Sequence, residues 1–132
     1  MGEERKIASQ EDEGYFFDSY AIIEILEQNP NYEKYKESEA TLTVFNLAEI
    51  YYSCLDGFNK EELEEIYSKY KESVVEIDDE TLKEAMRFRK EHRKKNLSYT
   101  DCIGYIYAQR HNMKFLTGDK EFHDLSGVEF VK

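Results

Sequence analysis

Four acidic residues fall where apolar, strand-like runs end or where helices are expected to begin. They are Asp18, Glu49, Asp101 and Asp119. In a parallel α/β sheet, ligands bind beyond the carboxyl ends of the strands, so we expect these acids to meet at one edge. Carboxylates repel one another unless a cation neutralises them, and an all-oxygen set favours Mg²⁺ or Mn²⁺ over zinc. The pattern therefore indicates metal-assisted hydrolysis of a phosphodiester.

Three of these acids also have a purely structural interpretation. Asp18 is a suitable N-cap for a helix that begins at Ser19. Asp101 stands three residues after Ser98, which is the spacing of a capping box. Asp119 suits an Asx turn or a cap. A single position does not separate these roles, whereas the joint pattern favours a shared site.

Glu49 is the acid that a surface role explains least well. It lies between apolar neighbours in the segment 47–51, and no cation stands near it in the sequence. A buried carboxylate requires a partner, because its desolvation is costly. We therefore expect Glu49 to belong to a polar site rather than to be freely solvated.

The elements that would position these acids alternate between strand and helix. Strands are expected at 14–17, 41–44, 73–77, 114–117 and 128–131. Helices are expected after Asp18, after the break at 29–31, and over about 45–55, 59–70, 78–95 and 98–111. The expected caps of the last three are Asn59, either Asp78 or Asp79, and Ser98. In the helix at 78–95, the residues expected to face the core are Leu82, Ala85 and Met86. Strands separated by helices imply an α/β fold with a parallel sheet covered on both faces.

The composition limits the class of protein. The 132 residues carry a net charge of −11, which argues against a nucleic-acid partner because phosphates repel an acidic surface. An apolar share of 40% argues against a disordered chain, and no apolar segment is long enough to span a membrane. Residues 1–13 are expected to be a disordered leader without a secretory signal, and residues 14–132 a single domain.

Cysteine and histidine give no indication of a metal-thiolate or zinc site. Cys54 and Cys102 belong to no CxxC pair and are expected to be buried thiols of a reduced, cytoplasmic protein. His92, His111 and His123 show no zinc-ligand spacing. The four acids remain the candidate ligands.

Four segments carry a resemblance to a known family. Segments 15–20, 43–49, 97–102 and 115–122 resemble the motifs of the PIN domain in their order and approximate spacing. The subgroup that they resemble most is the VapC-type toxins of toxin–antitoxin pairs. The resemblance covers about residues 15–132 and implies a three-layer α/β/α sandwich with a Mg²⁺- or Mn²⁺-dependent ribonuclease site. It also implies an RNA substrate, a homodimer, and a small antitoxin that fills the active-site groove.

The resemblance assigns roles to individual residues. It makes the same four acids the catalytic residues and metal ligands: Asp18, Glu49, Asp101 and Asp119. Thr117 matches the hydroxyl residue of the last motif and is expected to orient a ligand or its water. Asp124 is expected to be a surface residue. The leader at 1–13 departs from the family, whose toxins commonly begin close to the first strand.

A basic stretch offers a way for an acidic chain to hold RNA. Six of the nine residues from 87 to 95 are basic: Arg87, Arg89, Lys90, Arg93, Lys94 and Lys95. They precede the Asp101 segment and are expected to form a phosphate track, with Lys120 as a further candidate. The alternative is an ordinary solvated helix face.

Other functions fit the sequence less well. A haloacid-dehalogenase-like phosphatase needs a second Asp where Tyr20 stands. A response-regulator receiver domain needs an acidic pair at the end of the first strand, where Asp18 is single. The alternative that stays open is a non-catalytic, PIN-like binding or interaction module.

Overall fold

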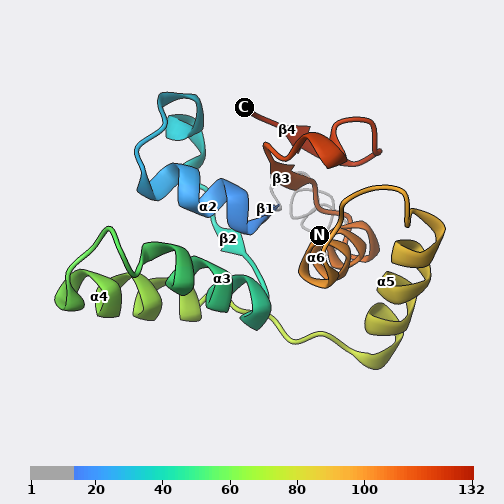
Figure 1. Cartoon of the computed structure of the whole chain (residues 1–132), viewed down its shortest axis with the longest axis horizontal. Helices are drawn as coiled ribbons and strands as arrows, with labels where there is room; N and C mark the ends of the chain where they lie inside the picture. The colour runs from blue at the N-terminus through green and yellow to red at the C-terminus, as the bar shows by residue number, and fades with distance from the viewer. Residues whose placement is uncertain (1–13) are drawn as a thin grey trace, which may run out of the picture.

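A four-stranded parallel sheet lies at the centre of the computed structural model, which describes residues 14–132 (Figure 1). The strand order is β2 (Ala40–Thr41), β1 (Tyr15–Phe17), β3 (Phe115–Thr117) and β4 (Val128–Phe130). The helices are α2 (Ser19–Leu26), α3 (Val44–Cys54), α4 (Lys60–Lys71), α5 (Asp79–Glu91) and α6 (Tyr99–Arg110), with 3₁₀ turns η1 (Pro30–Tyr35) and η2 (Lys120–Phe122). None of these helices has the length and apolar character needed to cross a bilayer. The leader predicted at 1–13 lies outside the described residues.

The two faces of the sheet support two separate cores. Phe17 and Leu116 are register neighbours on β1 and β3, and they pack with α2, α3 and α4. Phe16 and Phe115 point to the opposite face and pack with α5 and α6. Successive side chains of a strand alternate in this way between its faces. Helices therefore cover both faces, and the expected three-layer α/β/α sandwich is confirmed.

Helix α6 packs directly on the sheet. A Cβ atom at Gly104 would lie 2.6 Å from the ring of Phe16, so glycine is what permits this approach. Six of the twelve residues of α6 are buried, all of them between Cys102 and Ala108, where its sequence is most apolar. The chain passes from α6 into β3 through a short turn, so the two elements run antiparallel. The first turn of α6, with Asp101, therefore lies at the edge where β3 ends.

Two expected strands are wrong or too long. The segment 73–77 is not a strand, since it forms one isolated bridge, between Val74 and Leu42 beyond the end of β2. The strand expected at 41–44 stops at Thr41, because Thr43 caps α3 in a capping box with Asn46. Capping is a local interaction, and here it outweighs the β-branched composition.

The charged helix α5 is shorter than expected and is turned differently. It begins after Asp78, one of its two predicted caps, but ends at Glu91 rather than near Lys95. Its buried residues are Thr81 and Ala85, which lie one turn apart, and the partly buried Met86 packs against the core as predicted. Leu82 is turned about 100° away from that face and is 43% exposed, so its predicted inward position is wrong. Residues 92–95 add no apolar side chain to the core and form the turn toward α6.

Candidate functional site

Asp18 is a buried carboxylate at the end of β1. Its side chain is only 3% exposed and caps α2 by accepting from the Ser19 N–H at 2.9 Å. Its second oxygen accepts from the Thr117 hydroxyl at 2.7 Å, and Thr117 in turn accepts from the Asp119 N–H at 3.0 Å. The capping role and the site role therefore coexist in one residue. Thr117, fully buried at the end of β3, fixes the orientation of the carboxylate.

The pKa of Asp18 reports how closely the other acids approach it. Burial raises this pKa to about 8, and the negative charge of Asp101 is the next cause. The hydrogen bond from Thr117 lowers it, while the charges of Glu49 and Asp119 raise it. Four residues from separate stretches thus share one electrostatic environment, as the sequence pattern predicted.

Glu49 is held by a hydrogen-bond network that joins α2 and α3. The Ser19 hydroxyl donates to Glu49 Oε1 at 2.6 Å, and the Asn46 amide donates to the Ser19 hydroxyl at 2.9 Å. Asn46 is itself fixed by the Thr43 capping box. Glu49 is half-buried and partnered, so the expectation that it is not freely solvated is confirmed. Sequence reasoning missed Ser19 and Asn46, although Asn46 lies one helical turn before Glu49 on the same face.

The other two acids also combine a structural and an electrostatic role. Asp101 forms a capping box with Ser98, through bonds of 2.9 and 3.0 Å. Burial raises the pKa of Asp101 to about 6, against those two hydrogen bonds, and the charges of Asp119 and Glu49 raise it as well. Asp119 caps η2 by accepting from the Glu121 N–H at 3.0 Å. Both carboxylates are therefore fixed near the ends of the strands.

The chemistry of these side chains fits a hard divalent cation. The donors are carboxylate oxygens, and within residues 14–132 no Lys, Arg or His forms an ion pair with any of them. Mg²⁺ and Mn²⁺ prefer this type of donor, and a bound cation would relieve the repulsion that raises the pKa of Asp18. The residues that would hold the ion are those predicted from the sequence: Asp18, Glu49, Asp101 and Asp119.

The four acids are not arranged as a ready-made set of ligands. Among the residues that the structure describes, no three Asp, Glu, His or Cys side chains form a group that could hold one ion. Each carboxylate instead accepts from its own local donor, and mutual repulsion opposes closer approach. Binding an ion would therefore require some of these side chains to exchange local donors for the cation.

An open groove of about 410 Å³ adjoins Glu49. Ile23 of α2 and Ala48 and Tyr52 of α3 provide its apolar surface, and Ser19 and Glu49 line one side. Tyr52 is 77% exposed, and α3 and its C-cap expose further large apolar side chains, namely Val44, Phe45 and Leu55. Residues of α2 and α3 form this groove jointly, so it was not predicted from the sequence.

Within the predicted basic stretch at 87–95, one base forms an ion pair with a described residue and the other five do not. Lys95 forms a 2.8 Å ion pair with Asp124, which is exposed as predicted. Arg93, in the turn after α5, donates to the backbone carbonyl of Lys90 at 3.0 Å. In the part of the chain that the structure describes, no ion pair involves Arg87, Arg89, Lys90, Arg93 or Lys94. Lys120 is exposed beside Asp119.

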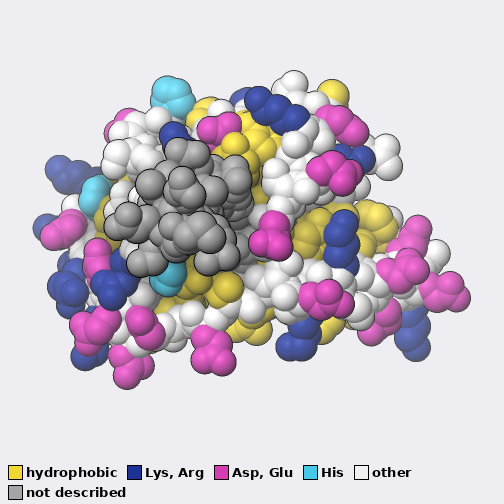
Figure 2. Space-filling model, turned by 180° about the vertical axis from the view of Figure 1, so that it is seen from behind, with side chains coloured by type: hydrophobic (Ala, Val, Ile, Leu, Met, Phe, Trp, Pro, Cys, Tyr) yellow, Lys and Arg dark blue, Asp and Glu magenta, His cyan; other side chains and the backbone are white. Residues whose placement is uncertain are grey.

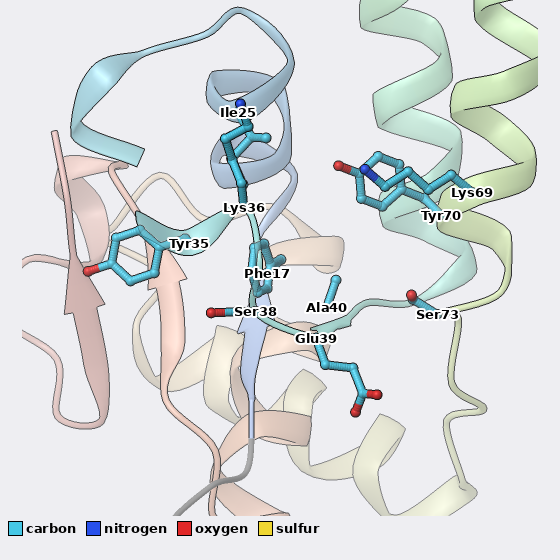
Figure 3. A pocket seen from close by; sticks show the side chains of 10 residues that line it. All are labelled: Phe17, Ile25, Tyr35, Lys36, Ser38, Glu39, Ala40, Lys69, Tyr70 and Ser73. Carbon is cyan, nitrogen blue, oxygen red and sulfur yellow. The ribbon is translucent and has the colours of Figure 1, made fainter. Parts of the chain in front are cut away.

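A second pocket lies at the other edge of the sheet and contains none of the four acids. It has a volume of about 210 Å³ and is lined by residues of η1, β2 and α4, among them Tyr35, Ala40 and Tyr70 (Figure 3).

Cys54 and Cys102 are buried free thiols, as predicted, and burial raises the pKa of Cys102 to about 11. Neither thiol contributes to the acidic site.

Comparison with known proteins places this arrangement in a family. A chain of a toxin–antitoxin complex from Klebsiella pneumoniae has a similar structure, with a TM-score of 0.70. The two sequences are 17% identical, and the likeness covers 87% of this chain and 95% of that one, which at such identity shows the fold alone. No curated protein matches the chain. The PIN domain profile matches residues 15–128, so the chain belongs to the PIN domain family.

Proposed function

We propose that this chain is a Mg²⁺- or Mn²⁺-dependent endoribonuclease and the toxin of a type II, VapC-type toxin–antitoxin pair. PIN domains are generally nucleases. The observation that carries the proposal is Asp18, a buried carboxyl whose pKa is raised to about 8, by burial and by three other acids. Such a carboxyl is suited to a site that binds a cation, because the cation offsets both causes.

Each residue of the site has a defined task in this proposal. A divalent ion would supply Lewis-acid activation and charge neutralisation at a phosphodiester. Asp18, oriented by Thr117, would be one of its ligands. Glu49 is positioned by Ser19, and Asp101 and Asp119 are positioned by the caps in which they take part. The rigid caps restrict where the carboxylates lie before substrate arrives.

The proposal is tested by cleavage of single-stranded RNA with and without divalent ions. We expect cutting with Mg²⁺ or Mn²⁺ and none in a chelator. Asp18→Asn is expected to lower the rate at least about 10³-fold, since several kcal/mol of transition-state stabilisation depend on the ion. Asp79→Asn is the matched control, because Asp79 is an exposed acid at the start of α5. Full activity of Asp18→Asn, or cutting in the chelator, would contradict the mechanism.

A non-catalytic PIN-like binding module is the second candidate. It is favoured by the observation that the described acids form no ready-made ligand group. Thermal unfolding with added Mn²⁺ separates the two functions, because a ligand that binds the folded state stabilises it. A rise of the melting temperature in the wild type, absent in Asp18→Asn, supports the nuclease. No shift in the wild type supports the binding module.

An antitoxin partner and a homodimer belong to the same proposal. The structural neighbour from Klebsiella pneumoniae is described as a toxin–antitoxin complex. The groove beside Glu49, with its exposed apolar side chains on α3, is a suitable surface for a partner protein. Co-expression with the product of a small neighbouring reading frame, followed by size-exclusion chromatography, tests both assemblies. We expect a stable complex and a loss of RNA cleavage within it.

A further inference from the structure

A hollow of about 360 Å³ lies where the basic half of α5 meets the first residue of α6. Its lining residues are Met86, Arg87, Arg89, Lys90 and Tyr99, and we call it the Tyr99 hollow. Tyr99 is 61% exposed, so much of its surface is open to a ligand. The Tyr99 hollow thus brings one aromatic ring together with three cationic side chains.

Arg89 is held against the ring of Tyr99. Its guanidinium carbon lies 4.5 Å from the ring centroid, and its Nε donates to the Leu97 carbonyl at 3.0 Å. The carbonyl belongs to the turn just before α6, so this hydrogen bond fixes the guanidinium relative to the helix start. The pair is therefore organised before any ligand binds.

The three cationic side chains of the Tyr99 hollow form no ion pair among the described residues. Ion pairs within residues 14–132 take up other bases, such as Lys95 with Asp124 and Arg110 with Glu84. None of them involves Arg87, Arg89 or Lys90. Figure 2 shows Lys and Arg side chains gathered, among some acids, along the side of the molecule that α5 forms. These charges remain available for an anionic ligand.

We propose that the Tyr99 hollow binds one nucleotide of a single-stranded RNA. The base stacks on the Tyr99–Arg89 pair, and the adjoining phosphates contact Arg87 and Lys90. Aromatic rings and guanidinium planes are the surfaces on which unpaired RNA bases stack, and flexible cations follow the backbone. An acidic peptide would use the same cations but has no comparable use for the exposed ring, so the ring favours RNA.

The position of the Tyr99 hollow defines its role. Tyr99 and Asp101 are two residues apart on one helix, so their side chains leave the axis about 200° apart. The bound nucleotide therefore lies on the other side of the first turn of α6 from the acidic site. It flanks the phosphodiester that is cut and is not itself the reacting group. This inference rests on the proposed function, and it makes Tyr99 and the cations positioning residues for the RNA.

The stacking contact is tested with Tyr99→Ala and Tyr99→Phe in the full chain. Binding of a short fluorescein-labelled single-stranded RNA is followed by anisotropy in a chelator, and cleavage is measured separately with Mn²⁺. Tyr99→Ala is expected to raise Kd and KM about fivefold or more, with kcat within about twofold, because one stacked base is lost. Tyr99→Phe keeps the ring and is expected to bind as the wild type does.

The phosphate contacts are tested with the double variant Arg87→Gln, Lys90→Gln. Its RNA binding is expected to weaken and to depend less on salt. The slope of log K for RNA association against log salt concentration is negative, and its magnitude is expected to decrease by up to about 1.4. The double variant Lys60→Gln, Lys71→Gln removes the same charge from two exposed positions of α4, a helix that lies at the opposite side of the molecule from α5 (Figure 1). That control is expected to keep the salt slope of the wild type.

The outcomes separate this inference from the proposed function. Normal cleavage by the wild type, with unchanged Kd, KM and salt slope in the variants, would overturn the Tyr99 hollow and leave the nuclease intact. Absence of cleavage by the wild type would refute the nuclease, while the chelator binding assay still reports on the hollow. Poly-glutamate is the competing ligand: if the double variant loses only poly-glutamate binding and Tyr99→Ala binds RNA normally, the hollow docks an acidic protein segment and the inference is wrong.

Discussion

Two helices of this protein begin with the same capping motif in different surroundings. At α6, Ser98 and Asp101 exchange hydrogen bonds of 2.9 and 3.0 Å, and at α4 Asn59 and Glu62 exchange two of 2.8 Å. Glu62 is exposed, whereas Asp101 is half-buried with a pKa raised to about 6, chiefly by burial. The motif starts each helix equally well. The neighbouring acids, which only the fold supplies, give Asp101 its candidate role in the site.

The largest expected difference between the capping box of α6 and that of α4 is their effect on the rate of RNA cleavage. Asp101→Asn keeps an oxygen that accepts from the Ser98 N–H but removes the charge that a cation would need. We expect kcat/KM for RNA cleavage with Mn²⁺ to fall about 10²-fold, a loss of about 3 kcal/mol. Glu62→Gln makes the equivalent change in the α4 box, where Gln is an accepted capping residue, and should leave the rate within about twofold. Equal rates for the two variants would remove the distinction between the boxes.

The local part of this fold was predictable from the sequence. Asn59 and Ser98 were predicted as caps and are the caps, and Asp78 is the cap out of the two predicted candidates, Asp78 and Asp79. A cap depends on residues three positions apart, so it can be read from the local sequence. The strand expected at 73–77 was wrong, because strand formation depends on a partner elsewhere in the chain. Beyond the single bridge to Leu42, this segment has no such partner among the described strands.

In the candidate site too, the features set by local sequence were predicted, and those set by contacts between elements were not. The four acids were found by their positions at the ends of elements, and the charges that raise the pKa of Asp18 agree with their convergence. The support of Glu49 by Ser19 was missed, because it joins two helices across 30 positions of sequence. The Tyr99 hollow was also missed, since the sequence presents Arg89 only as one of several bases on a charged helix. Contacts between elements require the fold.

The second expected difference is in how stability depends on pH when no metal is bound. The folded-state pKa values of Asp18 and Asp101 are raised to about 8 and about 6, above the usual values that apply in the unfolded chain. The folded state therefore binds more protons between about pH 4 and pH 8, so the contribution of these groups is fully present below about pH 4 and is lost as pH rises. The slope reaches at most about 1.4 kcal/mol per pH unit for each proton.

Urea unfolding in a chelator, from pH 5 to pH 8, measures this effect. Asp101→Asn is expected to flatten the fall between pH 5 and pH 7, and Asp18→Asn the fall up to pH 8. Glu62→Gln should keep the wild-type slope, because Glu62 is exposed and is not among the charges that raise the pKa of Asp18 or Asp101. Saturating Mn²⁺ should also reduce the slope. A wild-type slope in Asp18→Asn would show that the acids do not interact as described.

The smallest expected difference is in the caps themselves. Ser98→Ala and Asn59→Ala each remove one capping acceptor and are expected to lower the free energy of unfolding by about 1 kcal/mol. The two losses should be similar, because each acceptor satisfies the same kind of N–H group at the third helical position. Activity should separate them, since Ser98→Ala also loosens the turn that holds Asp101 and is expected to lower the cleavage rate a few-fold. If both variants lose the same stability and neither loses activity, the Ser98 box supports only the helix, and the position of Asp101 is fixed by the packing of α6 on the sheet.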